Sequence, residues 1–171
     1  NIKKKTVFVI EASSYQLEYS KIFKSKYVAI LNISPDHIER HKTLSNYVKA
    51  KFKLIKNQYK GNLAFVKKDD ILINKQLKSY SFGIKIIKVN TKKNNFLKNI
   101  NNSYFFNEAN KANLLFVLEI SKKIDIKNNS LIKTVQKFNG LKYRQQIILK
   151  RKNLMIINDS KSTSFSSSIG L

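Results

Sequence analysis

The stretch YVAILNISPDHIERHKTLSNYVKAKFKLIKNQYKGNLAFV, residues 27–66, decides the fold class of this chain. Its first six residues, 27–32, form an apolar and partly β-branched run that predicts a buried strand. Residues 44–55 then carry apolar side chains at helical spacing after Thr43, a residue type that caps helices. Residues 63–66 predict another short strand. This alternation of strands with a helix predicts an α/β fold.

Apolar runs on either side of this stretch extend the pattern. Residues 6–10, TVFVI, predict a buried strand that ends at Glu11. Residues 69–102 alternate weakly and are rich in Lys and Asn, which predicts short strands and turns around Gly83. Ligands of open α/β sheets bind at the carboxyl ends of the strands, so the polar residues that follow these runs are candidates for a site.

The C-terminal part combines two helices with a hairpin. Residues 112–122 predict one helix, and a second helix is predicted directly after a cap at Ser130. Residues 146–149 and 154–157 predict a β-hairpin. Residues 160–168 are rich in serine and follow a strand, a composition that fits both a loop entering a helix and a low-complexity tail.

The composition is that of a globular protein. Hydrophobic residues make up 42% and aromatic residues 11% of the 171 residues, enough apolar side chain for a core. The absence of cysteine excludes a disulfide framework and a cysteine nucleophile, and it is compatible with a reducing, cytoplasmic location. The longest apolar runs are far shorter than the roughly 18 residues that span a bilayer, so we expect no membrane partner.

The net charge of +24 would by itself suggest binding to nucleic acid. Only three of the 34 basic residues are arginines, however, and the lysines are spread along the whole chain. Nucleic-acid sites favour clustered arginine for bidentate contacts to bases and phosphates. We therefore interpret the charge as a solvated surface and expect no nucleic-acid partner. A basic nucleic-acid-binding module is the alternative from another functional class.

Polar residues follow the first predicted strand. They are Glu11, Ser13, Ser14, Gln16 and Glu18. A carboxylate placed just past a buried strand suits Mg²⁺, which prefers a few hard oxygen ligands. A helix-capping or turn role is the alternative for these residues.

Two further polar groups follow later strands. The segment DHIERH, residues 36–41, holds both histidines of the chain. A zinc protease is not expected, because the zincin pattern needs Glu directly after the first histidine, where this chain has Ile38. Taken alone, His37 fits a structural, hydrogen-bonding histidine. The segment NDSKST, residues 158–163, fits an ordinary turn with an N-cap.

Taken together and in order, six blocks of this sequence resemble the Mur ligase family. The blocks are EASSYQLE at residues 11–18, LNISPDHIERH at 31–41, YVKAK at 47–51, NKAN at 110–113, FNGLKYR at 138–144 and NDSKST at 158–163. They cover nearly the whole chain. The last block favours the member of the family that adds D-glutamate, because related enzymes that add diaminopimelate or lysine carry a Tyr-Ala-His-type motif there.

The resemblance implies a magnesium site with a modified lysine. Glu11 and His37 match catalytic Mg²⁺ ligands of the family, and Lys51 matches a lysine that becomes carbamylated, so that an ammonium turns into a carboxylate able to support the metal. The helical spacing places Tyr47 and Lys51 on one face, from which Lys51 would point toward the sheet edge that presents Glu11 and His37. An ordinary solvated lysine is the alternative.

The resemblance also implies two sets of binding residues. Positions that surround the base, ribose and phosphates of ATP are matched by Asn110, Asn113, Arg144 and Asp159. Positions that contact the UDP-muramoyl substrate are matched by Ser13, Ser14 and Gln16, and from the C-terminal domain by Lys161 and Thr163.

The implied activity is ATP-dependent amide-bond formation in peptidoglycan precursor synthesis. The carboxylate of UDP-N-acetylmuramoyl-L-alanine would attack the γ-phosphate of ATP, giving an acyl phosphate and ADP, and the amine of D-glutamate would then displace phosphate. The resemblance further implies a cytoplasmic bacterial enzyme that is monomeric at full length. A Mur-type ligase for a different amino acid is the nearest alternative.

The resemblance implies a mainly parallel sheet flanked by helices. Residues 1–138 would form the latter part of a central ATPase domain, and residues 139–171 the opening of a Rossmann-like C-terminal domain. The chain departs from the family pattern at Ala109, Lys142 and Tyr143, and it contains no glycine-rich phosphate loop. We therefore interpret the chain as a fragment and expect no ligase turnover from it alone, because positioning of the phosphates supplies most of phosphoryl-transfer catalysis.

Overall fold

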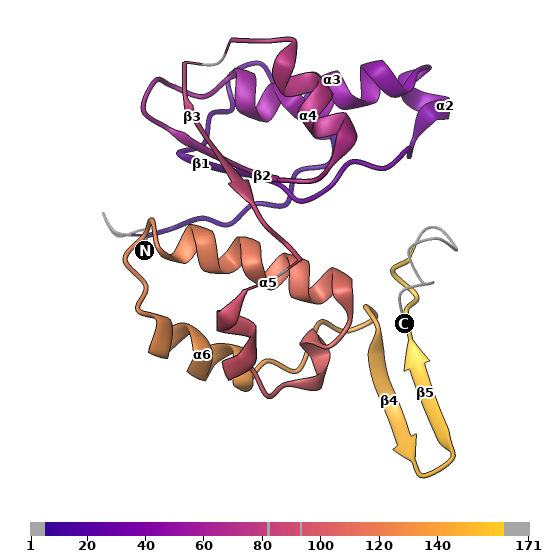
Figure 1. Ribbon diagram of the computed structural model, residues 1–171. Helices are drawn as coiled ribbons and strands as arrows, with labels where there is room; N and C mark the ends of the chain where they lie inside the picture. The colour runs from indigo at the N-terminus through magenta and orange to yellow at the C-terminus, as the bar shows by residue number, and fades with distance from the viewer. Residues whose placement is uncertain (1–5, 82, 93, 163–171) are drawn as a thin grey trace. The chain divides into compact units, whose positions relative to one another are not determined.

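The computed structural model describes residues 6–81, 83–92 and 94–162. The chain divides into two compact units, Asn1–Lys88 and Val89–Leu171 (Figure 1). The domain boundary near residue 138 stays a prediction, since it concerns the organisation of a longer protein.

The first unit is built around a three-stranded sheet. Its elements are α1 (Ser14–Tyr19), β1 (Tyr27–Ile30), α2 (Ile38–His41), α3 (Leu44–Lys56), β2 (Leu63–Lys67), α4 (Ile71–Lys78) and β3 (Lys85–Val89). The strand order is β1-β2-β3, and β1 pairs with β2 in parallel, from Tyr27 opposite Leu63 to Ile30 opposite Val66. The predicted α/β fold with a parallel sheet and flanking helices is confirmed.

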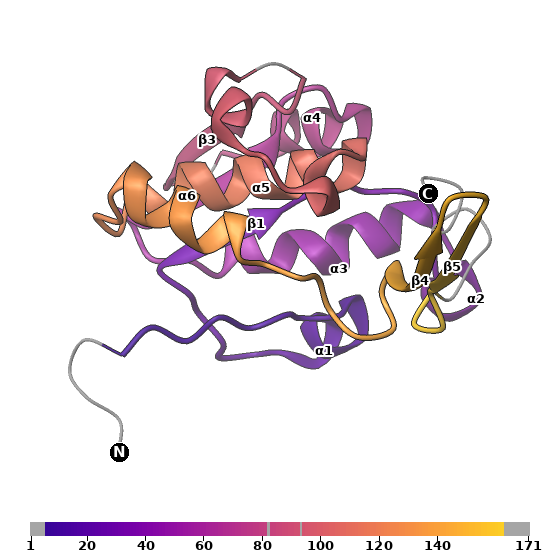
Figure 2. The ribbon, with the colours of Figure 1, turned by 90° about the horizontal axis from the view of Figure 1, so that it is seen from below.

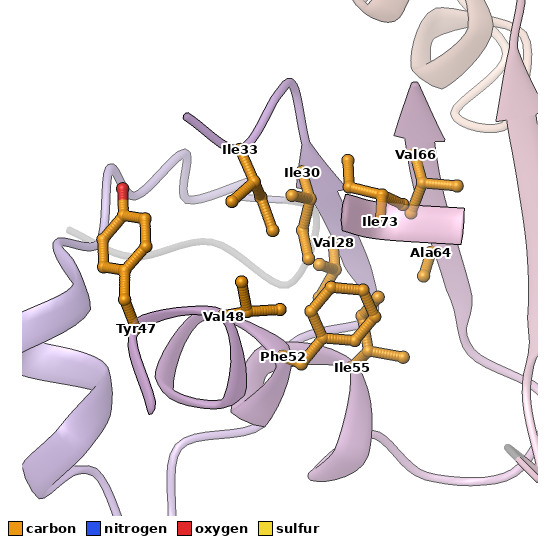
Figure 3. Close-up of a cluster of buried hydrophobic side chains, with 10 residues drawn as sticks. All are labelled: Val28, Ile30, Ile33, Tyr47, Val48, Phe52, Ile55, Ala64, Val66 and Ile73. Carbon is orange, nitrogen blue, oxygen red and sulfur yellow. The ribbon is translucent and has the colours of Figure 1, made fainter. Parts of the chain in front are cut away.

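The core of the first unit lies between the sheet and the helices α3 and α4, which cover one of its faces (Figure 1). Side chains of β1 and β2 meet the apolar face of α3 there, with Phe52 and Ile55 pointing toward the strands (Figure 3). Helix α3 begins where the sequence predicts, because the Thr43 hydroxyl accepts a hydrogen bond of 3.1 Å from the Asn46 backbone N–H. Burial of this apolar face stabilises the helix more than its intrinsic propensity does.

The short helix α1 packs beside α3 (Figure 2). The Lys53 ammonium of α3 donates a hydrogen bond to the Glu18 carbonyl of α1, and Leu17 of α1 is buried. The segment that carries the first predicted site residues is thereby attached to the same helix that carries Lys51.

The prediction of a buried strand at residues 6–10 is wrong. The structure assigns no strand there, and residues 7–10 are 61–95% exposed. A strand forms only when a neighbouring strand pairs with its backbone N–H and C=O groups, and an apolar pattern does not supply that neighbour.

Helix α4 is a second difference from the sequence prediction, which expected strands and turns across residues 69–102. The helix has only eight residues, and Asp70 caps it by accepting a hydrogen bond of 2.9 Å from the Ile73 backbone N–H. A 3₁₀-helix, Asn95–Asn99, occupies the end of the same region and a second, Ser103–Phe105, follows it, while β3 is a strand as expected. Short helices contain too few turns for their apolar periodicity to stand out.

The second unit combines helices with an antiparallel hairpin. Its helices are α5 (Glu108–Ser121) and α6 (Asn128–Gln136), and its strands are β4 (Gln146–Arg151) and β5 (Leu154–Asn158). Both helices and the hairpin are confirmed, but α6 begins at Asn128, before Ser130, and its N-cap residue Lys127 makes no side-chain capping hydrogen bond. Within the described ranges, no helix is long and apolar enough to cross a membrane.

Gly140 occupies a position that excludes a side chain. Its φ of 80° is left-handed, and a Cβ atom built there would lie 2.7 Å from the ring of Tyr104. That ring cannot move easily, because it packs edge-on against Phe105 and Phe138 at centroid distances of 5.0 and 5.1 Å. Gly61 has a similar φ of 89°, but a Cβ atom at Gly61 would meet nothing within 4 Å.

These two glycines separate steric crowding from backbone strain. Gly140→Ala is expected to lower the free energy of unfolding by about 1–3 kcal/mol more than Gly61→Ala, because overpacking adds to a left-handed strain that both variants share. Urea titration followed by circular dichroism measures the difference. Equal losses for the two variants would show that the Tyr104 ring yields without cost.

Candidate active site

The side-chain carboxylate of Asp70 connects the segments that follow the C-terminal ends of β1 and β2. Asp70, which follows β2, accepts a hydrogen bond of 2.9 Å from the Ile33 backbone N–H just past β1, and its other oxygen caps α4. Two chain segments that leave the same edge of the sheet are therefore fixed to each other. The segment after β1 leads directly to Asp36 and His37.

His37 stands at the start of α2 in a strained conformation. Its φ of 53° and ψ of 33° are left-handed, which costs a residue other than glycine roughly 1–2 kcal/mol. Its side chain is 35% exposed, with Nε2 3.5 Å from Asp36 and Nδ1 3.9 Å from Glu39. Strained backbone that persists around a partly exposed titratable side chain is a feature of functional sites.

Lys51 is half-buried on α3, with its Nζ 5.2 Å from the centroid of the Tyr47 ring. Burial lowers the pKa of Lys51, and the negative charge of Asp36 opposes that change. Burial also raises the pKa of Tyr47, and there Asp36 acts in the same direction. Because Asp36 acts on both groups, Lys51 lies within electrostatic reach of the loop that carries His37.

The residues after Glu11 form the start of α1. Ser13 and Gln16 make a capping box, in which Ser13 Oγ accepts from the Gln16 N–H at 3.2 Å and Gln16 Oε1 accepts from the Ser13 N–H at 2.8 Å. The capping role considered for them is therefore confirmed. Glu11, Ser13 and Gln16 are all exposed.

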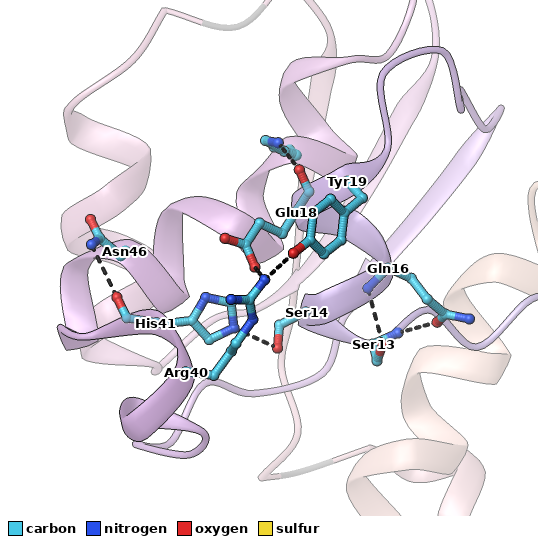
Figure 4. A network of polar contacts seen from close by, with 9 residues as sticks. Ser13, Ser14, Gln16, Glu18, Tyr19, Arg40, His41 and Asn46 are labelled. Carbon is cyan, nitrogen blue, oxygen red and sulfur yellow. Dashed lines mark hydrogen bonds and ion pairs between the residues drawn. The ribbon is translucent and has the colours of Figure 1, made fainter.

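A network of polar contacts ties α1, α2 and the start of α3 together (Figure 4). Ser14 and His41 are 3% and 4% exposed, and the Ser14 hydroxyl lies 3.0 Å from His41 Nε2. Arg40 forms an ion pair of 3.2 Å with Glu18, and the Asn46 amide donates to the His41 carbonyl at 3.0 Å. These hydrogen bonds and this ion pair thus connect three parts of the chain: the helix α1 that follows Glu11, the helix α2 that begins after His37, and the helix α3 that carries Lys51.

The predicted metal site contains fewer than three of the side chains that usually bind metal ions. In the part of the chain that the structure describes, no three His, Cys, Asp or Glu side chains come close enough to hold a metal ion. The predicted trio contains two such residues, Glu11 and His37, and Lys51 would be an oxygen ligand only as its carbamate. The donors fit a hard cation such as Mg²⁺ once Lys51 is modified.

In the second unit, Asn107 and Gln145 connect three segments that carry predicted nucleotide residues. Asn107 caps α5 by accepting from the Asn110 N–H at 2.8 Å, and its amide donates to Gln145 Oε1 at 3.1 Å. The Gln145 backbone N–H in turn donates to Asp159 at 3.1 Å. Asn110 and Asp159 are therefore attached to the loop that contains Arg144.

The backbone of this loop is strained on both sides of Arg144. Tyr143 and Gln145 have left-handed φ values of 66° and 48°. The Lys161 N–H donates to the Tyr143 carbonyl at 3.1 Å, which brings Lys161 to the same loop. Asn113 is exposed one turn after Asn110 on α5. The predicted site residue Thr163 lies outside the described residues.

Several residues that organise these sites were missed by the sequence analysis. Asn107 had a usable signal, because an Asn three residues before Asn110 is a typical N-cap. Asp70 would have been found as a cap if α4 had been recognised. Gln145 had no local signal, since its role depends on contacts with residues 38 and 14 positions away.

Comparison with known proteins gives a consistent result. Residues 1–131 match the family of the Mur ligase middle domain. UDP-N-acetylmuramoylalanine--D-glutamate ligase of Alkaliphilus oremlandii is 32% identical over 181 residues, covering 95% of this chain and 40% of the relative. The protein of the same name from Leptospira interrogans is 34% identical over 174 residues, covering 93% and 37%. The chain thus spans about two fifths of the length of these relatives.

Solved structures show the same fold at lower identity. MurF ligase from Thermotoga maritima in complex with ADP matches with a TM-score of 0.72 and 14% identity, over 93% of this chain and 41% of that one. MurF from Acinetobacter baumannii matches with a TM-score of 0.69 and 16% identity, over 92% and 38%.

Proposed function

This chain belongs to the Mur ligase family, and on that premise we propose that it forms part of an ATP-dependent ligase that joins D-glutamate to UDP-N-acetylmuramoyl-L-alanine in peptidoglycan precursor synthesis. The observation that carries the proposal is the 30–34% identity, over more than nine tenths of this chain, to relatives that share the name of that ligase. A cytoplasmic location and a monomeric full-length enzyme are part of the proposal.

The proposed reaction has two steps. A carboxylate oxygen of the muramoyl substrate attacks the γ-phosphorus of ATP, and the bond between this phosphorus and the oxygen that bridges it to the β-phosphate breaks. ADP departs, and the muramoyl substrate becomes an acyl phosphate. The nitrogen of D-glutamate then attacks the acyl carbon, loses a proton and displaces phosphate. The first step brings one anion onto another, so it depends on positioning and electrostatic stabilisation.

The N-terminal unit would supply the metal ligands. We assign Glu11, His37 and carbamylated Lys51 to Mg²⁺, whose charge would stabilise the phosphoryl group during transfer. Carbamate forms when a neutral amine attacks carbon dioxide, and the lowered pKa of Lys51 increases its neutral fraction. The Lys51 carbamate would be an anion within electrostatic reach of the Asp36 carboxylate. Two such anions would together favour the binding of a cation.

The remaining assignments concern the two substrates. Residues assigned to ATP are Asn110, Asn113, Arg144 and Asp159, all of which belong to segments joined through Asn107 and Gln145. Residues assigned to the muramoyl substrate are Ser13, Ser14, Gln16, Lys161 and Thr163. Ser14 would act by holding its segment, because its hydroxyl is bonded to His41.

The activity is tested by phosphate release from a ligase that contains this chain, supplied with ATP, Mg²⁺ and UDP-N-acetylmuramoyl-L-alanine. We expect release with D-glutamate and at most background release with lysine or diaminopimelate. Release with one of these other amino acids instead would support the alternative, a Mur-type ligase of different specificity. No release with any amino acid would contradict the proposal.

A further inference from the structure

We propose that Tyr15 is a positioning residue that fixes the His37 imidazole, and that the buried hydrogen bond between Ser14 and His41 holds Tyr15 in place. The Tyr15 ring lies against both histidine rings. Its centroid is 4.9 Å from that of His37 at an interplanar angle of 54°, and 5.7 Å from that of His41 at 28°. Tyr15 is thereby the aromatic link between the two histidines.

His41 is the fixed end of this arrangement. It is buried, its Nε2 lies 3.0 Å from the buried Ser14 hydroxyl, and its carbonyl accepts from Asn46. The Tyr47 ring contacts its imidazole at a centroid distance of 5.5 Å. A buried polar ring with a hydrogen-bond partner has little freedom to rotate, because rotation would leave both partners unpaired.

His37 is the end that requires support. Its ring nitrogens lie 3.5 and 3.9 Å from the carboxylates of Asp36 and Glu39, beyond the length of an ordinary hydrogen bond. Its side chain is partly exposed and its backbone is left-handed. Tyr15 therefore supplies the packing contact that restricts the orientation of the His37 ring.

The consequence for metal binding rests on the proposed function, in which His37 is a ligand. Tyr15 belongs to α1, which follows Glu11, so one contact relates the two proposed ligands Glu11 and His37. Residues that orient a metal-bound histidine without touching the metal change its affinity by roughly 10–100-fold when they are replaced. We expect a loss in that range when the Tyr15 ring is removed.

The chain contains only two histidines, which makes the first test direct. In the 171-residue chain labelled with ¹³C at the histidine Cε1 position alone, two ring C–H signals are expected at a fixed pH, one from each histidine and both displaced by the ring current of Tyr15. Tyr15→Leu should move both signals toward their unstacked positions, and Tyr15→Phe should keep them near the wild-type positions. Tyr19→Leu is the matched control, because Tyr19 lies on the same helix but contacts Arg40.

Ser14→Ala tests the anchor. Its expected effect is displacement of the His37 signal together with that of His41, although the hydroxyl of Ser14 is hydrogen-bonded to His41. Methyl signals of the core confirm that each variant is folded. An unchanged His37 signal in Tyr15→Leu, or in Ser14→Ala, would overturn the corresponding half of the proposal.

A titration with Mn²⁺ separates positioning from the metal assignment. If Mn²⁺ broadens the His37 signal of the wild-type chain, Tyr15→Leu should weaken the apparent affinity by roughly 10–100-fold and Tyr15→Phe should restore it. Equal affinity in Tyr15→Leu would overturn the positioning role. Absence of broadening in the wild type would count against His37 as a ligand, and the ring signals would still decide whether Tyr15 orients it.

Discussion

Asp70→Ala is expected to lower the free energy of unfolding of the first unit by about 2–4 kcal/mol, the combined effect of losing a helix cap and leaving a buried N–H unpaired. The lost cap is that of α4 at Ile73, and the unpaired N–H is that of the buried Ile33. Urea titration measures the total loss. Amide hydrogen exchange at Ile33 and Ile73 resolves its two parts.

Two variants provide the reference for this loss. Thr43→Ala removes a helix cap alone and should cost about 1 kcal/mol. Asp70→Asn keeps one oxygen that can accept from one of the two backbone N–H groups, of Ile33 and Ile73, but its side-chain NH₂ group faces the other one. The loss in free energy of unfolding should therefore fall between those of Thr43→Ala and Asp70→Ala. If Asp70→Ala costs no more than Thr43→Ala, the hydrogen bond to Ile33 contributes nothing to stability.

Lys51→Arg is expected to lower the turnover of a ligase that contains this chain by at least about 10²-fold, the usual scale for losing a group that stabilises transition-state charge. Arginine stays protonated, so it cannot form the carbamate, and it would leave a cation beside the proposed Mg²⁺ site. The Michaelis constant for the muramoyl substrate should change much less than the turnover.

Lys49→Arg is the control for this prediction, because Lys49 is exposed on the same helix. It should keep full activity. With ¹³C-bicarbonate, a carbamate signal should appear in the wild type and in Lys49→Arg but not in Lys51→Arg, and it should grow as the pH rises through the lowered pKa of Lys51. Full activity of Lys51→Arg in buffer depleted of carbon dioxide would contradict the carbamate assignment.

The parts of the fold that could be predicted are those specified by local sequence. Helix α3 has an apolar face and a capping Thr43, and the hairpin has two apolar runs around a short turn. Each of these signals lies within the element that it specifies. Residues 6–10 have the composition of a strand as well, but strand formation depends on a partner elsewhere, and that condition cannot be inferred from the run itself.

The sequence allows a set of candidate site residues to be proposed, but it does not allow their contacts to be predicted. The family resemblance predicts His37 and Lys51 as site residues, whereas their environment depends on Asp36, on Tyr15 and on the hydrogen bond from Ile33 to Asp70. These contacts join positions far apart in the chain, and several involve a backbone group, which carries no residue-specific signal. Left-handed backbone at His37 is similarly invisible in a sequence that has no glycine there.

Because residues 6–10 are exposed and mostly apolar, we expect self-association of this chain to depend on its net charge. The run is uncharged, contains no proline and is β-branched or aromatic throughout, the composition of segments that stack into cross-β aggregates. The net charge of +24 keeps copies of the chain apart. The range of that repulsion shrinks from about 30 Å at 0.01 M salt to about 8 Å at 0.15 M. We therefore expect self-association of this chain to increase with ionic strength, because residues 7–10 are exposed and residues 6–10 form no strand.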